Sequence, residues 1–325
     1  MAYLQINLNR SREAQALALH TMEVKGANVL CISEPNCIPD HPGWVGSTDG
    51  KCALFFQQNQ HVLRTGSGAG YAWADLDDLR IYSCYISPKC TLNEFDVFLY
   101  RLFDSVRGAT SEVIVSGDFN AHSPAWGSHK TNPRGKALIE IVESLNLLVL
   151  NDGKVPTFPH VNSFLDLTLV AKGITRKIGS WEVLEQESLT DHQYVFFNTR
   201  MTLRSVQTEK NGWSWRKLDI DRLDKFIAEA KTPLSMTAET SSTALSELLR
   251  NACNSCMPKG TYKWGEKPCY WWSQTIAELR KECMHSRRKL RKSRTRNEDC
   301  VSKLEEYKVL KRKLKAEIRK SKENS

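Results

Sequence analysis

Short apolar runs alternate with amphipathic segments along the first 200 residues of this chain. Apolar runs of about four to eight residues between turn-forming residues are typical of buried strands, and apolar residues three and four positions apart indicate helices. Strands are expected at Leu4–Leu8, Val29–Ser33, Cys52–Phe56, Tyr71–Leu76, Leu79–Ile86, Glu112–Ser116, Leu147–Asn151, Phe164–Val170 and Tyr194–Thr199, with a turn at Gly66–Gly68. Helices are expected at Glu13–Lys25, Asn93–Val106 and Arg134–Leu145. Short strands with helices between them predict a layered α/β fold.

The pattern changes after Thr199. Two helices are expected at Leu218–Ala230 and Ser242–Cys256, followed by a loop at Pro258–Pro268 and one long helical stretch from Trp271 to Lys322. Within that stretch a single thin apolar stripe lies among many basic residues; it consists of Leu304, Tyr307, Leu310, Leu314 and Ile318. The sequence therefore predicts an α/β domain over residues 1–200 and a helical extension over residues 201–325.

Charge separates the same two regions. Residues 1–200 contain 17 Lys and Arg against 21 Asp and Glu, whereas residues 201–325 contain 29 against 16. Residues 281–325 alone hold 17 basic and 7 acidic side chains. A basic extension beside a slightly acidic domain favours a polyanionic partner such as nucleic acid. The alternative is a helix whose charged face is only solvated.

The chain does not open with a basic leader and a long apolar run, and no apolar stretch is long enough to span a bilayer. We therefore expect an intracellular protein without membrane contact, and short basic runs are compatible with a nuclear address. Ten cysteines without regular spacing favour reduced thiols in this setting. Cys253 and Cys256 could begin a zinc site, but their helical spacing with Leu249 and Ala252 favours an apolar helix face.

Polar side chains that suit metal-assisted hydrolysis accompany several predicted strands. Such chemistry needs a cation beside the substrate, a group that orients or deprotonates water, and a group that stabilises the leaving oxygen. Hard divalent cations prefer oxygen ligands from carboxylates and amides. The candidates are Asn7, Glu34, Asp118, Asn120, Asp166, Asp191 and His192, each in or next to a predicted strand. A shared site at one sheet edge requires polar residues collected at strand ends in this way.

Asp166 is the least expected of these residues, because it lies in the apolar run Phe164–Val170. A carboxylate in such a run needs a partner, and a histidine is a suitable one. A salt bridge to a lysine or an arginine would explain it as well. Taken singly, Gly117-Asp118 could be only a turn, and His192 could be an ordinary surface or core histidine.

Six sequence blocks, in order, resemble the endonuclease/exonuclease/phosphatase superfamily. They are Gln5-Ile6-Asn7, Ser33-Glu34-Pro35, Ser83-Cys84-Tyr85, Gly117-Asp118-Phe119-Asn120-Ala121-His122, Ser163-Phe164-Leu165-Asp166-Leu167-Thr168 and Leu189-Thr190-Asp191-His192. With the stretches Asn120–Gly127 and Arg134-Gly135, nearly all of residues 1–200 look like the apurinic-type endonuclease domain of non-LTR retrotransposons of the Jockey and I-factor kind. The segment from Lys267 onward resembles the linker before the reverse transcriptase of such elements, so the chain is expected to be a fragment of a larger protein.

The resemblance implies a four-layered α/β sandwich with a metal site. It implies that Glu34 binds Mg²⁺, with Mn²⁺ as a substitute, and that Asn7 helps. Asp191 would support the metal or the leaving group. Asn9 stands where repair enzymes of the superfamily carry an acid, which weakens a second metal position.

The resemblance also implies catalytic roles for the remaining matched residues. Asp118 would orient or deprotonate the attacking water, and Asn120 would hold that water or the phosphate. Tyr85 would contact the phosphate. Asp166 would fix the tautomer of His192, which would contact the scissile phosphate.

The function implied is an endonuclease that nicks one DNA strand and leaves a 3′-hydroxyl as primer for reverse transcription. DNA would be the partner of the domain, and the element's RNA is a second candidate partner of the basic tail. Such a protein would act in the nucleus after synthesis in the cytoplasm. Two alternatives stay open: a phosphatase or sphingomyelinase of the same fold, and an inactive or domesticated nucleic-acid-binding fragment.

Overall fold

The computed structural model describes the chain as two compact units. The described residues are 1–57, 62–201, 211–213, 218–229, 238–257, 259–261, 270–296 and 300–323. One unit comprises Met1–Val206 and Cys269–Ser325, and the other comprises Gln207–Pro268. The C-terminal helices therefore belong to the same unit as the N-terminal α/β domain, although the second unit separates them in the sequence.

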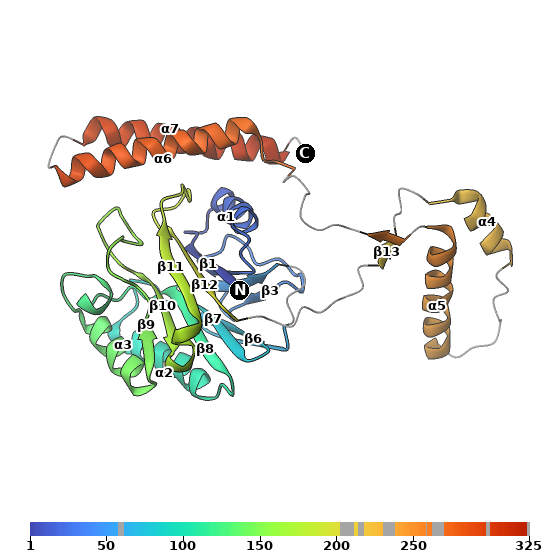
Figure 1. The fold of residues 1–325 in the computed structure, drawn as a ribbon, viewed down its shortest axis with the longest axis horizontal. Helices are drawn as coiled ribbons and strands as arrows, with labels where there is room; N and C mark the ends of the chain where they lie inside the picture. The colour runs from blue at the N-terminus through green and yellow to red at the C-terminus, as the bar shows by residue number, and fades with distance from the viewer. Residues whose placement is uncertain are drawn as a thin grey trace. The chain divides into compact units, whose positions relative to one another are not determined.

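Two six-stranded sheets form the centre of the first unit (Figure 1). The first sheet contains β1 (Ala2–Asn7), β2 (Val29–Ser33), β3 (Trp44–Gly46), β4 (Cys52–Phe56), β11 (Ile178–Leu184) and β12 (Tyr194–Thr199). The second sheet contains β5 (Arg64–Gly68), β6 (Tyr71–Leu76), β7 (Leu79–Tyr85), β8 (Glu112–Asp118), β9 (Leu147–Val149) and β10 (Asp166–Ala171). The strand orders are β11-β12-β1-β2-β4-β3 and β5-β6-β7-β8-β10-β9. Among the described strands, each sheet has one parallel pair, β1–β2 in the first and β7–β8 in the second.

A helix connects the strands of each parallel pair. Helix α1 (Arg12–Lys25) joins β1 to β2, and helix α2 (Leu92–Arg107) joins β7 to β8. Parallel neighbours need such a crossover because their strands run in the same direction. Helix α1 ends at Gly26, whose φ of 63° suits a residue without a side chain. Helix α2 begins with a capping box between Thr91 and Glu94.

Helices cover the outer faces of both sheets and complete four layers. Helix α1 packs on the first sheet, and α2 and α3 (Pro133–Ser144) pack on the second. Short 3-10 helices lie at Pro124–Trp126 and Lys172–Lys177. The core between the sheets includes Tyr3, Leu54, Ala74, Ile81, Ile114, Val170 and Phe197. This arrangement confirms the expected four-layered α/β sandwich.

Buried polar side chains join the two sheets across this apolar core. Ser33 Oγ donates to Cys84 O at 2.9 Å, and Ser83 Oγ donates to Ile32 O at 3.0 Å. Buried polar groups are destabilising unless they are paired, so these bonds fix the position of β2 against β7. The carboxyl ends of the two parallel pairs are thereby held close together.

Most expected strands and helices are confirmed, but β3, β5 and β11 were not expected. The turn expected at Gly66–Gly68 is wrong, because β5 continues through it in register with β6. A Cβ on Gly66 would lie 2.4 Å from the ring of Trp73, and one on Gly68 would lie 2.5 Å from the ring of Tyr71. These glycines therefore leave room for aromatic rings of the next strand.

The single long helix expected from Trp271 to Lys322 is also wrong. Two helices, α6 (Gln274–Thr295) and α7 (Val301–Glu323), lie side by side and form a structure that we call the α6–α7 hairpin (Figure 1). Leu314 and Ile318, from the thin apolar stripe of this region, are fully buried. They belong to the same apolar cluster as residues of α1 and the first sheet.

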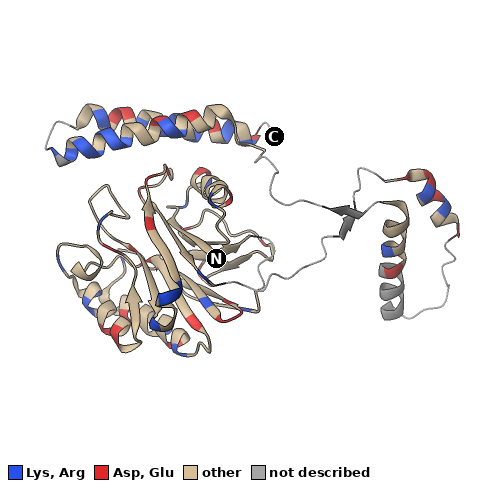
Figure 2. Ribbon diagram, viewed as in Figure 1, with Lys and Arg blue, Asp and Glu red and all other residues tan. Residues whose placement is uncertain are grey.

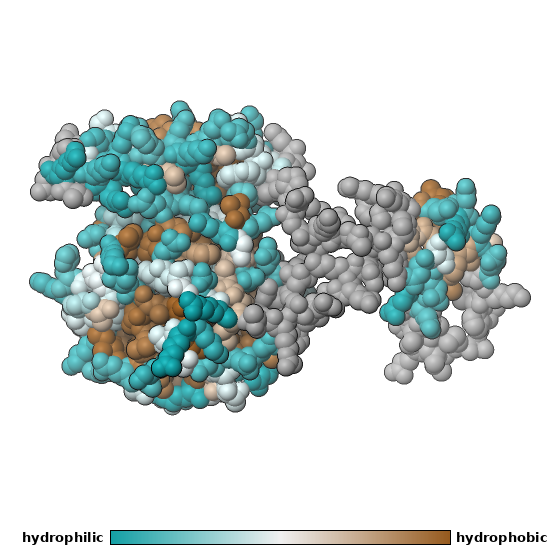
Figure 3. Space-filling view, in the orientation of Figure 1, coloured by the Kyte–Doolittle hydropathy of each residue, from teal (hydrophilic) through white to brown (hydrophobic). Residues whose placement is uncertain are grey.

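Polar contacts also attach the α6–α7 hairpin to the α/β domain. Arg280 Nη2 donates to Glu187 O at 3.0 Å, and Tyr307 Oη donates to Glu187 Oε2 at 2.9 Å. At the other end, Arg319 Nη2 donates to Glu13 Oε1 at 3.0 Å. Lysines and arginines recur along both helices (Figure 2), and the visible surface of the hairpin is mostly hydrophilic (Figure 3). The hairpin is therefore a docked part of the first unit as well as a basic surface.

The second unit contains α4 (Ile220–Glu229) and α5 (Ala238–Cys256), which confirm the two helices expected there. It also contains β13 (Asn211–Trp213) and β14 (Lys259–Thr261), which form an antiparallel pair. The loop expected at Pro258–Pro268 is therefore wrong over β14, and its other residues lie outside the described part of the chain. No helix in the described residues is sufficiently long and apolar to cross a membrane.

Candidate active site

The carboxyl ends of the two parallel strand pairs carry most of the predicted site residues. Asn7 and Ser33 end β1 and β2 and are register partners. Tyr85 and Asp118 end β7 and β8 and are register partners as well. Asp166, the first residue of β10, lies opposite Asp118 on its other side. The fold thus gathers residues that are far apart in the sequence at one edge of both sheets.

Gly117-Asp118 belongs to β8 and is not a turn. A Cβ on Gly117 would lie 2.2 Å from the carbonyl oxygen of Cys84 in the neighbouring strand. Glycine is therefore required for the close approach of β7, and this approach sets the position of Asp118 next to Tyr85.

Asp118 is the centre of the site. Its Oδ2 accepts a hydrogen bond from Asn7 Nδ2 at 2.9 Å and lies 3.9 Å from His192 Nε2, while its Oδ1 accepts from the Asn120 N–H at 3.1 Å. Burial and then the charge of Asp166 raise the pKa of Asp118 to about 7, although His192 and the hydrogen bonds from Asn7 and Asn120 oppose the rise. A buried carboxyl with a pKa near neutrality suits a group that exchanges a proton during catalysis.

His192 is almost fully buried and bonds to Asp166, with 2.8 Å between Nδ1 and Oδ2. Asp166 therefore pairs with a histidine, and not with a lysine or an arginine. The ring of Phe158 packs edge-on against the imidazole, with 4.7 Å between centroids. Burial alone would lower the pKa of His192, but the carboxylates of Asp166, Asp118 and Asp191 outweigh it and raise the pKa to about 9. These carboxylates therefore favour the protonated form of the imidazole.

Contacts that involve the α6–α7 hairpin help to hold the conformation of the loop before His192. Leu189 has a φ of 65°, which is unusual for a residue with a side chain. Its N–H donates to Glu187 Oε1 at 2.8 Å, and Ser188 Oγ donates to His192 O at 2.6 Å. The same Glu187 carboxylate accepts the bond from Tyr307 of α7, so one buried acid links the loop that carries His192 to the hairpin.

Glu34 follows β2 in a left-handed backbone conformation, with a φ of 47°. One carboxylate oxygen accepts from Asn7 Nδ2 at 3.3 Å, and the other lies 3.9 Å from Arg10 Nε. Burial and the charge of Glu34 raise the pKa of Tyr85, which keeps its phenol protonated as a donor. A strained residue among charged groups marks a place where function, and not stability, fixes the conformation.

Asn120 and Asp191 differ in their surroundings. Asn120 has a φ of 48°, and its Nδ2 donates to Ile86 O at 3.0 Å, which orients the amide. The Asp191 side chain is 48% exposed and lies 3.3 Å from Lys311 Nζ on α7. Asp191 adjoins His192 in sequence, but its carboxylate faces the hairpin and not the buried cluster.

The comparisons with known proteins agree on one superfamily. Residues 79–196 match the family described as endonuclease-reverse transcriptase. The endonuclease domain of TRAS1, a telomere-specific non-LTR retrotransposon, is 26% identical with a TM-score of 0.55, over 61% of this chain and 97% of that chain. The α/β domain is similar to nucleases of the endonuclease/exonuclease/phosphatase superfamily, and in particular to the retrotransposon endonucleases. An AP endonuclease from Archaeoglobus fulgidus, 13% identical with a TM-score of 0.51 over 62% of this chain and 100% of that chain, shares the fold. A comparison with the curated proteins gives no match.

This nuclease domain is a hydrolase that acts on phosphodiester bonds of nucleic acid. Its buried donor set fits a divalent metal ion. Asp118, Asp166 and His192 are the described group whose potential ligand atoms all lie within 4.8 Å of one another. Asp166 Oδ1 is buried and has no hydrogen-bond partner among the described residues, which leaves one acceptor free for a cation. The two carboxylates offer oxygen ligands that suit such an ion, and the imidazole could join them only in its neutral form.

Asn7 of the nuclease domain presents its amide nitrogen to the carboxylates of Glu34 and Asp118. Its Oδ1 accepts from the Asn9 N–H at 2.8 Å, which fixes this orientation. In this conformation Asn7 positions the two acids, whereas the metal-ligand role that the resemblance implies would require its oxygen to face them.

Three residues of the nuclease domain and the hairpin were not expected at the site. Phe158 lies in a loop and packs on His192, Arg10 approaches Glu34, and Lys311 reaches Asp191 from α7. Phe158 between Pro156 and Pro159 is an apolar residue in a polar loop, which is a weak signal. Nothing in the sequence distinguishes Lys311 from the other basic residues of its helix.

Proposed function

We propose that this chain is a divalent-metal-dependent DNA endonuclease that nicks one strand and leaves a 3′-hydroxyl to prime reverse transcription. The observation that carries the proposal is the contact series from Asp166 through His192 to Asp118, beside the two acids joined by Asn7. It supports this activity because phosphodiester hydrolysis needs a proton acceptor and a fixed positive charge within reach of one phosphate.

Mg²⁺, or Mn²⁺ in its place, bound with Glu34 and the neighbouring donors would neutralise charge on the phosphate and on the leaving oxygen. Asp118 takes a proton from the attacking water as the water oxygen bonds to phosphorus. The bond between phosphorus and O3′ breaks and O3′ takes up a proton from solvent water, which leaves a 3′-hydroxyl and a 5′-phosphate. His192, held as a cation by Asp166, stabilises the negative charge of the pentacoordinate phosphate through Nε2.

The other predicted residues hold the substrate in this scheme. Tyr85 donates its phenol hydrogen bond to a phosphate oxygen, and Asn120 orients the water or the phosphate with its fixed amide. Asp191 supports the leaving group once Lys311 yields its ion pair to the DNA. A chromosomal target would place this reaction in the nucleus, with DNA as the substrate and the element's RNA as a second ligand of the basic hairpin.

A plasmid-nicking assay tests the proposal directly. The full chain is incubated with supercoiled DNA in Mg²⁺, in Mn²⁺ and in EDTA, with Asp118→Asn as the inactive control. We expect open circles only with metal, and nicks that a DNA polymerase extends without prior end repair. Extension only after phosphatase treatment would contradict the predicted 3′-hydroxyl.

The same preparation distinguishes the alternatives. Release of phosphate or phosphocholine from an inositol phosphate or sphingomyelin, without nicking, would favour the phosphatase or sphingomyelinase reading. DNA binding without any hydrolysis in either metal would favour an inactive binding fragment.

A further inference from the structure

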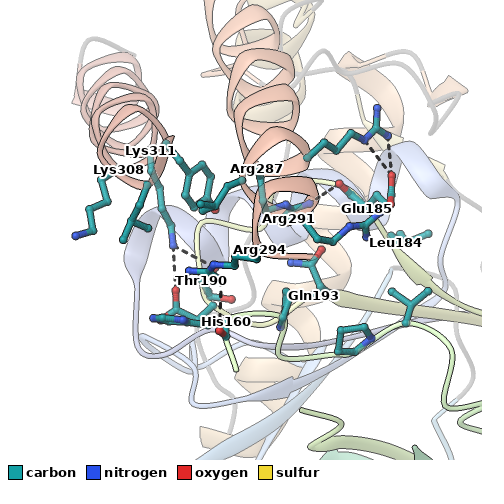
Figure 4. A pocket seen from close by; sticks show the side chains of 18 residues that line it. His160, Leu184, Glu185, Thr190, Gln193, Arg287, Arg291, Arg294, Lys308 and Lys311 are labelled. Atoms are coloured by element: carbon teal, nitrogen blue, oxygen red, sulfur yellow. Dashed lines mark hydrogen bonds and ion pairs between the residues drawn. The ribbon is translucent and has the colours of Figure 1, made fainter. Parts of the chain in front are cut away.

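A cavity of about 340 Å³ lies between the α6–α7 hairpin and the loops of the nuclease domain. Its walls come from residues 155–160, from residues 184–193 and from both helices. Figure 4 shows arginines of α6 and Lys311 of α7 near the loop that contains Thr190, with Lys308 at the edge of the pocket. This volume lies at the lower end of the range for ligand pockets, about 300–1,000 Å³.

The cavity has a strong excess of positive charge. Six basic side chains line it, against the two acids Glu185 and Asp191. The basic residues are Arg287, Arg288, Arg291, Arg294, Lys308 and Lys311. A concave site with this imbalance concentrates anions.

The existing ion pairs at the cavity are weak enough to be exchanged. Lys311 Nζ lies 3.3 Å from Asp191, and Arg288 and Arg291 each lie 2.9 Å from Glu185, with both acids substantially exposed. Exposed pairs of this kind stabilise a fold by about 0–1 kcal/mol, so a bound phosphate can take over these cations at little cost.

The cavity also has apolar lining residues, which come from the loop and from both helices. They include Pro156, Pro159, Leu290, Leu304 and Tyr307. A free inorganic anion gains nothing from such residues, whereas a nucleotide presents a phosphate to the cations and a flat base to the prolines and the tyrosine ring. The combination of basic and apolar lining residues therefore fits a unit of a nucleic-acid strand.

The cavity begins at the catalytic loop. Thr190, Asp191 and Gln193 line it, and they flank His192 on both sides in the sequence. The cavity therefore adjoins the loop that carries His192.

We propose that this cavity binds the backbone and one base of the DNA strand next to the scissile phosphate, so that the α6–α7 hairpin forms part of the substrate site. The inference rests on the proposed function, because it takes DNA as the substrate. It gives the hairpin a role in substrate binding, so the nuclease domain without the hairpin would lack these contacts to DNA.

Matched charge reversals test the proposal in the full chain. The cavity variant is Arg294→Glu with Lys308→Glu, and the control is Lys289→Glu with Lys320→Glu, which changes the net charge equally outside the cavity lining. Binding of a labelled duplex of about 30 base pairs is measured by fluorescence anisotropy in EDTA across a salt series. We expect the cavity variant to lose about 10-fold more affinity than the control and to show a salt slope shallower by about 2.

A second pair of variants changes shape without charge. Leu304→Trp fills the cavity, while Val309→Trp adds the same ring to an exposed position of α7. Only Leu304→Trp should weaken DNA binding, and urea midpoints confirm that both variants fold.

The outcomes separate this inference from the proposed function. If the wild-type chain neither nicks nor binds DNA, the proposed function fails. If it nicks plasmid but the cavity variants bind like their controls, the inference alone is overturned. If single-stranded RNA competes for the cavity better than DNA of the same length, the assignment to the DNA strand is also overturned.

Discussion

Replacing Glu187 by alanine should separate the α6–α7 hairpin from the catalytic loop. The carboxylate is fully buried, and it accepts from the Leu189 N–H at 2.8 Å and from Tyr307 Oη at 2.9 Å. Arg287 Nη1 lies 3.5 Å from the same group and has no hydrogen-bond partner among the described residues. The substitution therefore removes two good hydrogen bonds and leaves a mostly buried guanidinium without this counter-charge.

The magnitude follows from these contacts. Hydrogen bonds to charged groups contribute about 1.5–3 kcal/mol each, and removing one partner of a buried ion pair costs about 3–5 kcal/mol. The Arg287 side chain is 16% exposed, so water compensates part of the loss. We expect Glu187→Ala to lower the free energy of unfolding of the first unit by about 3–4 kcal/mol.

Activity should fall together with stability. Leu189 adopts a backbone conformation that costs about 1–2 kcal/mol for a residue with a side chain, and its N–H bond to Glu187 offsets this cost. Without that bond the segment that ends at His192 relaxes, and the imidazole loses its alignment with Asp118. Nicking by the folded variant should therefore drop at least about 10-fold.

Glu185→Ala is the matched control. Glu185 lies two residues away and also pairs with α6, but its side chain is 41% exposed, so its two arginine contacts should contribute about 0–1 kcal/mol. Urea unfolding followed by tryptophan fluorescence compares the two variants with the wild type. Equal losses of stability in both would refute the reasoning that burial makes Glu187 the link.

Three further outcomes are expected from single substitutions. Glu34→Gln should keep the wild-type urea midpoint but lose Mg²⁺-dependent nicking, and a wild-type rate would remove Glu34 from the metal site. His192→Ala should slow nicking by about 10²-fold or more. Asp166→Asn should slow nicking by less, because the imidazole ring stays in place. If neither substitution changes the nicking rate, the pair has no part in the mechanism. Gly117→Ala should lower stability by more than about 3 kcal/mol or prevent folding, since its Cβ would meet Cys84 O at 2.2 Å, and an unchanged urea midpoint would contradict this.

The strand ends of the site were predictable because apolar runs stop where polar residues begin. Glu112–Ser116 is followed at once by Gly117-Asp118, and this local signal placed Asp118 at a sheet edge. The partner of Asp166 was not predictable from pattern alone. His192 lies 26 residues further along the chain, and only the family resemblance joined the two. The orientation of the Asn7 side chain depends on a hydrogen bond from the backbone N–H of Asn9 in the following turn. A pattern of apolar and polar residues does not predict such a bond.

The basic C-terminal region shows a second limit of sequence patterns. Its break into two helices is only weakly marked, because the sequence between Thr295 and Val301 contains no proline or glycine and only Asn297 and Asp299 as common helix-boundary residues. One thin apolar stripe cannot hold a core, but two such stripes on adjacent helices together cover α1 and bury Leu314 and Ile318.

The net charge of this region is consequently larger than the positive charge that can contact DNA. Arg280 and Arg319 donate to Glu187 O and to Glu13, and these bonds serve docking. Other cations, such as Arg294 and Lys308, line the cavity beside the catalytic loop. Each phosphate contact contributes about 0.9 to the salt slope of DNA binding. We therefore expect the slope of log affinity for DNA against log salt concentration to be much smaller than the number of basic residues in the hairpin would give. The difference would reflect the arginines that hold the hairpin to the nuclease domain.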